Sequence, residues 1–258
     1  MPGVFGVRWD RLLLVLACFS VSLVSHARRA AAFGDATAVE IVSLDVGSDS
    51  DRVKGVTERL AWEVRKRSSV EPILEPGRAK LDKASLFRSP FVYWRGREDF
   101  PPLSEAAIEG LRKYIHRGGF VFIDDATAGG EGFDHAVRRE LLRAFPALPL
   151  KPISADHTIY RSFYLLRRPV GRVQGPSFLE GITYGDRIAI VYSRHDVGGA
   201  FERDKLGAWS QAVVPGGEVQ REQAIRLGVN LVLYALCIDY KDDQVHAPFI
   251  MRRRGSGN

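Results

Sequence analysis

Short, nearly continuous apolar runs recur along this chain, and segments of helical character separate them. The runs at 39–46, 91–94 and 120–123 read VEIVSLDV, FVYW and FVFI. Strands that are apolar on both faces are typical of a parallel sheet that helices cover on both sides. Apolar residues at helical spacing and helix-ending signals predict helices over 49–67, 105–117 and 133–145. The sequence therefore predicts an α/β fold with a doubly wound, mostly parallel central sheet.

Turn signals place the remaining elements. Ser104 is predicted to cap the helix at 105–117, and Gly118-Gly119 to end it. The runs at 179–184 and 187–192 flank Gly185-Asp186, which predicts a β-hairpin added antiparallel to the sheet. The other segments are predicted to be a short extended piece around Ile73 and Leu74, an irregular insertion over 148–177, a long helix over 219–240, and an extended, mobile tail over 241–258.

The positive charge of the chain lies at its two ends. The net charge is +6, of which the first 32 residues carry +3 and Arg252 to Arg254 carry +3, so residues 33–251 sum to zero. A neutral body without a basic groove argues against a nucleic-acid partner. With 258 residues, 45% of them apolar, the chain suits one domain over 33–245, followed by a basic C-terminal tail over 246–258.

The first 32 residues are predicted to be a signal peptide. Arg8 and Arg11 precede an apolar run from Leu12 to Val24, and small residues follow it. We therefore expect an exported protein, periplasmic or associated with the cell envelope, in which peripheral membrane association is open. An uncleaved anchor is an alternative, although the run is short for a membrane span. Acylation at Cys18 as a lipoprotein is another alternative.

Cleavage near Ala32 would leave Cys237 as the one cysteine of the mature chain. No intramolecular disulfide could then form. Because Cys237 ends a strongly apolar helical stretch, it is predicted to be a buried, inert thiol.

Polar residues follow the predicted strands at their carboxyl ends, where ligands bind in open parallel sheets. Asp124 and Asp125 end one strand and lead into a loop of small residues, and His195-Asp196 follows the second arm of the hairpin. Asp156-His157 lies in the irregular insertion. A His beside an Asp can act as a base or hold a metal, but such pairs also fix loops through hydrogen bonds. We take these six residues as candidate ligand-binding residues.

The sequence does not contain the motifs of several common enzyme and nucleotide-binding classes. The serine-hydrolase elbow, the Gly-x-x-x-x-Gly-Lys phosphate loop and the Gly-x-Gly-x-x-Gly dinucleotide signature are all missing. No His-x-x-x-His spacing supports a metal site. We therefore predict neither a cofactor nor a bound metal.

Motifs along most of the chain carry a family resemblance. At GGFVFIDD, EGFDHAVRRELLRAFP, DHTIYRSFY and LEGITYGDRIAIVYSRHDVGGAFE, the chain resembles the bacterial family called domain of unknown function 4159. The resemblance implies a class I glutamine amidotransferase-like domain, a flavodoxin-like three-layer sandwich. It also implies an exported or membrane-tethered protein. Where glutaminases of that superfamily carry a nucleophilic Cys, this chain has Asp124-Asp125-Ala126, so thioester chemistry is excluded there.

Two functional hypotheses follow. The first is a non-catalytic module of the cell envelope that binds a small ligand or a protein partner at the strand ends. The alternative is a hydrolase that uses a carboxylate and a His, with or without a divalent metal, on a carbohydrate or an ester. A further reading makes Phe201, Trp209 and the loop at Gly198-Gly199 a protein-docking surface. The hydrolase requires the candidate residues to converge on one reacting centre.

Overall fold

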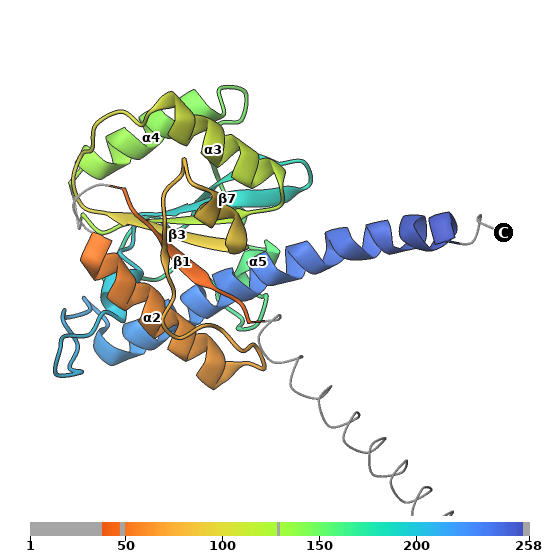
Figure 1. Ribbon diagram of the computed structural model, residues 1–258. Helices are drawn as coiled ribbons and strands as arrows, with labels where there is room; N and C mark the ends of the chain where they lie inside the picture. The colour runs from red at the N-terminus through yellow and green to blue at the C-terminus, as the bar shows by residue number, and fades with distance from the viewer. Residues whose placement is uncertain (1–37, 47–49, 128–129, 255–258) are drawn as a thin grey trace, which may run out of the picture. The chain divides into compact units, whose positions relative to one another are not determined.

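The computed structural model describes residues 38–46, 50–127 and 130–254 (Figure 1). Its strands are β1 (Ile41–Leu44), β2 (Arg78–Ala79), β3 (Phe91–Gly96), β4 (Phe120–Asp125), β5 (Lys151–Pro152), β6 (Glu180–Tyr184) and β7 (Arg187–Ser193). Its α-helices are α2 (Ser50–Arg67), α3 (Glu105–His116), α4 (Gly132–Ala144) and α5 (Gly217–Arg254). Short 3-10 helices are η1 (Ala84–Arg88), η2 (Thr158–Tyr160) and η3 (Gly198–Ala200).

The strands form one mostly parallel sheet in the order β2-β1-β3-β4-β7-β6-β5. The pairs β1–β2, β1–β3, β3–β4 and β4–β7 are parallel, whereas β6 pairs antiparallel with β7 and β5. The hairpin of β6 and β7 therefore supplies the last parallel strand and turns back along the sheet edge. The predicted α/β class, the parallel sheet and the added hairpin are confirmed, and the arrangement is that of a flavodoxin-like sandwich.

Helices cover both faces of the sheet, as Figure 1 shows. The core on one face packs α2 and α5 against Phe91, Tyr93 and Phe122. The core on the other face packs α3 and α4 against Trp94 and Ile123. Because successive residues of a strand point to opposite faces, each apolar run fills both cores at once. Burial on both sides is the physical reason that FVYW and FVFI lack alternating polar residues.

Local signals set the ends of the predicted elements. The Ser104 side chain accepts a hydrogen bond from the backbone N–H of Ala107 and so caps α3. Gly118 follows that helix with a φ of 99°, a conformation that favours glycine. The β6–β7 turn contains Gly185, with a φ of 64°. These positions confirm the predicted helix stop and hairpin.

Two expectations were wrong, and a third holds only in part. The extended piece around Ile73 and Leu74 forms an isolated parallel bridge between Pro72 and Val39, but the two-residue strand β2 lies further on, at Arg78–Ala79. Helix α5 continues to Arg254 where we expected an extended tail from 241. Cys237 is exposed, since that position of α5 lies beyond the part of the helix that packs on the sheet. The predicted signal peptide at 1–32 lies outside the described residues.

Candidate functional site

The carboxyl ends of β3 and β4 hold a buried ionic network. The Arg95 side chain is fully buried, and its Nη2 lies 2.6 Å from Asp196 Oδ1. Its Nε lies 3.6 Å from Asp124 Oδ2. The Nη1 of Arg95 has no hydrogen-bond partner among the residues that the structure describes. Two buried carboxylates thus flank the Arg95 guanidinium, and Arg172 also pairs with Asp196. These ion pairs tie β3 to β4 and to the segment after β7.

The carboxylate of Asp124 is fully engaged in hydrogen bonds within the protein. Its oxygens accept hydrogen bonds from the backbone N–H of Val197 and of Gly198, both at 2.8 Å, and from the Tyr93 hydroxyl at 2.8 Å. Burial and the nearby charge of Asp196 raise the pKa of Asp124 to about 6, against the lowering effect of Arg95. Asp124 therefore holds the start of η3 in place.

Asp196 has a similar structural role. Its backbone adopts a φ of 50°, which Asp tolerates better than most residues. Its carboxylate accepts hydrogen bonds from Arg95, from the Arg172 side chain and from the Gly199 N–H. Because Arg172 belongs to the irregular insertion, Asp196 joins that insertion to the end of β7.

Asp125 points away from this network, toward the face covered by α4. Its Oδ1 accepts hydrogen bonds from the backbone and side chain of Thr127. The Tyr192 hydroxyl lies 3.1 Å from Asp125 Oδ2 and 2.8 Å from Asp134 Oδ1. Burial raises the pKa of Asp125, although the hydrogen bonds from Thr127 and Tyr192 oppose the shift. Asp125 thus acts as a cap for the loop that follows β4.

The pair Asp156-His157 lies at the amino ends of the strands. We had expected it at the carboxyl ends, together with the other candidate residues. The His157 ring packs against Tyr234, whose own ring contacts Phe120 at the beginning of β4. The Nδ1 of His157 accepts the N–H of Ile159 and caps η2. Asp156 is exposed and accepts a hydrogen bond from Ser154. The insertion carries this pair to the amino ends of the strands, which sequence position alone does not reveal.

His195 is buried at the end of β7. Its Nε2 lies 2.8 Å from the Pro176 carbonyl oxygen, and its Nδ1 lies 3.1 Å from Ser193 Oγ. Since a carbonyl only accepts, Nε2 carries the proton and Nδ1 accepts from the Ser193 hydroxyl. Burial lowers the pKa of His195, so the ring is neutral at pH 7. A Cβ at Gly171 would lie 2.1 Å from the His195 carbonyl oxygen, which explains why glycine stands where the insertion passes this residue.

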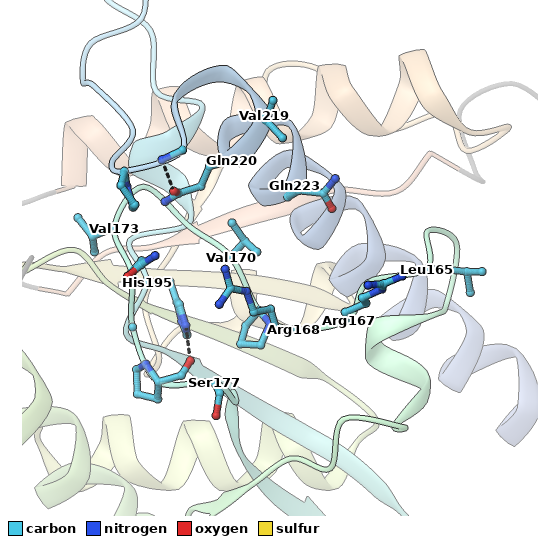
Figure 2. Close-up of a pocket in the computed structure, with 16 residues that line it drawn as sticks. Leu165, Arg167, Arg168, Val170, Val173, Ser177, His195, Val219, Gln220 and Gln223 are labelled. Atoms are coloured by element: carbon cyan, nitrogen blue, oxygen red, sulfur yellow. Dashed lines mark hydrogen bonds between the residues drawn. The ribbon is translucent and has the colours of Figure 1, made fainter.

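A pocket of about 590 Å³ opens beside His195, between the insertion and the first turns of α5. Figure 2 shows its lining: Arg167, Arg168 and Val170 come from the insertion, and Val219, Gln220 and Gln223 come from α5. Of the six candidate residues, His195 is the one that lines it. The volume is in the usual range for small-molecule sites.

The docking residues considered from the sequence are largely internal. Phe201, Gly198 and Gly199 are buried. The ring of Trp209 packs with the guanidinium groups of Arg203 and Arg221, at 3.7 and 4.3 Å from its centroid. This segment therefore belongs to the packing around η3.

The candidates do not assemble one reacting centre. Asp124, Asp196 and His195 have protein partners at their polar side-chain atoms, and Asp156-His157 lies at the other edge of the sheet. Within the described ranges, no group of three or more His, Cys, Asp or Glu side chains is placed to hold a metal ion. In the pocket, by contrast, Arg167, Arg168, Gln174 and Gln223 make no side-chain hydrogen bond or ion pair to another residue that the structure describes.

Sequence reasoning missed the arginines and glutamines of the pocket. Arg167-Arg168-Pro169 stands in a predicted loop, and Gln220 and Gln223 are three residues apart at the start of a predicted helix. Adjacent arginines in a loop, and two amides on one helix face, were the available signals. The sequence does not show that these segments meet, because about fifty residues separate them.

The comparisons with known proteins identify a family. In the described part of the chain, no helix is long and apolar enough to cross a membrane. No protein of curated function matches the sequence. The family described as Domain of unknown function (DUF4159) matches residues 39–236, which cover the whole sheet and the part of α5 that packs on it. The chain belongs to this DUF4159 family.

Proposed function

We propose that this protein is a non-catalytic ligand-binding module of the cell envelope, and that the ligand enters the pocket between the insertion and α5. One observation carries the proposal. The carboxylates and His residues suited to catalysis are engaged by protein groups, whereas four polar side chains of the pocket make no side-chain hydrogen bond or ion pair to another described residue: Arg167, Arg168, Gln174 and Gln223. Carboxylates and a His that are held by protein groups, beside an open pocket, favour binding over bond cleavage.

Export to the envelope is the second part of this proposal. It rests on the sequence of residues 1–32, where Arg8 and Arg11 precede a short apolar run. N-terminal sequencing of the protein from a periplasmic fraction tests it. A mature chain that begins near residue 33 is expected. A chain that still begins at Met1 would contradict cleavage.

We also propose a relationship to the class I glutamine amidotransferase-like superfamily. Its support is the flavodoxin-like strand order and the position of β4, whose end carries Asp124-Asp125-Ala126. A thiol nucleophile is missing at that turn, which agrees with a non-catalytic role. Superposition of an experimental structure on glutaminase domains tests the relationship. The end of β4 should coincide with their nucleophile turn.

The binding proposal is tested by screening small molecules for thermal stabilisation of the purified mature chain. Gln223→Trp places a large ring in the pocket and should abolish stabilisation by compounds that bind there. Glu109→Trp, on the exposed surface of α3 across the sheet, is the matched control and should keep it. If no compound stabilises the wild type more than Gln223→Trp, the pocket is not a binding site.

The same screen separates binding from catalysis. Each compound that stabilises the protein is incubated with it and recovered for mass spectrometry. We expect unchanged compounds. Recovery of a hydrolysed product that Gln223→Trp does not form would overturn the non-catalytic assignment.

A further inference from the structure

We infer that the pocket beside His195 binds the anionic group, a carboxylate or a phosphate, of a small molecule that also has an apolar portion. This inference rests on the proposed binding function and specifies the class of ligand. It depends on three features of the lining: its charge, its free amide groups and its apolar rim.

The charge of the lining is entirely positive. Arg167 and Arg168 line the pocket, and no Asp or Glu does. Elsewhere in the fold, Arg95, Arg138 and Arg172 each contact a carboxylate, but neither arginine of the pocket contacts one among the described residues. Two adjacent unpaired guanidinium groups raise the local potential and attract anions. The planar guanidinium also matches the geometry of carboxylate and phosphate oxygens.

His195 adds no charge to this pocket at neutral pH. Burial lowers its pKa, and the charges of Arg194 and Arg168 lower it further. Both of its ring nitrogens have partners in the protein. The arginines alone therefore supply the positive charge, and His195 forms part of the wall.

Side-chain amide groups in the pocket can add hydrogen bonds to a bound anion. The Gln220 amide already has partners, because its oxygen accepts the N–H of Gly216 and its nitrogen donates to the carbonyl oxygen of Gly171 in the insertion. Gln174 and Gln223 also line the pocket and make no side-chain hydrogen bond to another described residue. The first turn of α5 borders the same space, and the positive end of a helix dipole favours an anion there.

The rim of the pocket is apolar on two sides. Leu165 of the insertion is 86% exposed, and Val219 of α5 is 76% exposed. Val170 and Val173, both half-buried, also line the pocket. Exposed aliphatic side chains that flank a cationic pocket favour a ligand with both an acidic group and a hydrocarbon portion. A fully hydrated ion such as free phosphate would leave these side chains unused.

Octanoate, octyl phosphate and octan-1-ol test this inference by isothermal titration calorimetry on the mature chain. They share one hydrocarbon chain and differ in the head group. We expect both anions to bind and the alcohol to bind at least about tenfold more weakly, since hydrogen bonds to charged groups dominate. The stronger of the two anions then identifies the head group. Inorganic phosphate should bind more weakly than octyl phosphate.

The variant Arg167→Gln/Arg168→Gln should lose at least about tenfold in affinity for the better anion. Arg161→Gln removes an exposed arginine of the same insertion that does not line the pocket, and it should bind like the wild type. Both variants should keep the wild-type melting temperature, because these side chains are exposed.

The outcomes separate this inference from the proposed function. If octanol binds as tightly as octanoate, if neither anion binds, or if the double variant binds normally, the anionic class is wrong. The binding function still stands when the screen yields neutral compounds that Gln223→Trp excludes. If the screen yields no ligand that binds in the pocket, both the anionic class and the proposed binding function are wrong.

Discussion

A buried arginine at the end of β3 explains why the carboxylates at the ends of β4 and β7 are structural. Arg95 is fully excluded from water, and an unpaired charge in such a place is strongly destabilising. Asp124 and Asp196 neutralise it, and both also bind backbone N–H groups around η3. The chain thus uses its most conspicuous acidic residues to hold a loop and leaves the pocket to arginine and glutamine.

Removal of Asp124 should therefore damage stability. Asp124→Ala removes one of the carboxylates around Arg95 and leaves three buried donors without their acceptor: the N–H groups of Val197 and Gly198 and the Tyr93 hydroxyl. We expect a loss of about 3–5 kcal/mol in the free energy of unfolding, measured by urea titration at pH 7. Asp156→Ala removes an exposed carboxylate and should change stability by less than about 0.5 kcal/mol. Equal losses in the two variants would contradict the structural role of Asp124.

His195 makes stability depend on pH. Its pKa in the folded state lies below that of the unfolded chain, because burial disfavours the charged ring. Below the unfolded pKa of about 6.5, the unfolded chain gains a proton that the folded chain does not, so stability falls as pH decreases. His195→Gln removes this titration. In urea unfolding, the stability of the variant relative to the wild type should rise as the pH falls from 8 to 5, and a difference that stays constant would contradict the assignment.

At the residue scale, the sequence predicts where a polar residue lies in the fold better than it predicts which residues it contacts. Asp124, Asp125, His195 and Asp196 all lie at the carboxyl edge, because strand ends can be located from apolar runs. That Arg95 neutralises two of them depends on contacts across 29 and 101 positions. No local pattern encodes such a contact.

Glycines within helices show how packing decides the effect of a residue. Gly110 lies in α3, where a Cβ would come within 1.8 Å of the Leu81 carbonyl oxygen. Gly55 lies in α2, and a Cβ there would meet nothing within 4 Å. Helix propensity alone would predict the same gain from alanine at both sites.

We expect opposite outcomes for the two alanine variants. Gly110→Ala should lose about 1–3 kcal/mol, because the helix must move away from the segment that follows β2. Gly55→Ala, its control, should gain about 0.5–1 kcal/mol. Chemical denaturation of both variants checks this. A gain for Gly110→Ala would show that α3 does not pack closely on Leu81.

At the element scale, the well-predicted elements are those with strong local signals. The strands at FVYW and FVFI, the Ser104 cap and the Gly185 turn follow from apolar pattern and turn chemistry. Strand β2 has only two residues, and its position depends on pairing with Ser43 and Leu44. Such a short edge strand has no pattern of its own, so sequence placed it a few residues too early.

At the scale of the whole molecule, the insertion between α4 and β6 builds the pocket only because it is held against α5. Asn230 of α5 is fully buried and connects the two. Its side-chain amide donates to the carbonyl oxygens of Ile159 and Tyr164 and accepts the Tyr164 N–H at 2.7 Å. These contacts span 66 to 71 positions, so the sequence predicts an irregular insertion but not where it docks.

Asn230→Leu should loosen this attachment while the sheet stays intact. The variant leaves the Tyr164 N–H and two carbonyl oxygens without partners in a buried place, at a cost of about 1–3 kcal/mol for each group left unsatisfied. The cost falls on the insertion, because it can open locally while β3 and β4 remain paired. Hydrogen exchange should therefore accelerate across 159–177 more than in the central strands, and pocket ligands should bind more weakly.

Gln211→Leu provides the control for this local effect. Its amide donates to Glu202 at 3.0 Å, in the segment after η3, and has no contact with Asn230. It should leave exchange in 159–177 unchanged. An even rise across the chain in Asn230→Leu would mean that insertion and sheet unfold as one cooperative unit. A rise confined to 159–177, together with weaker ligand binding, would make the docking of this insertion the step that forms the site.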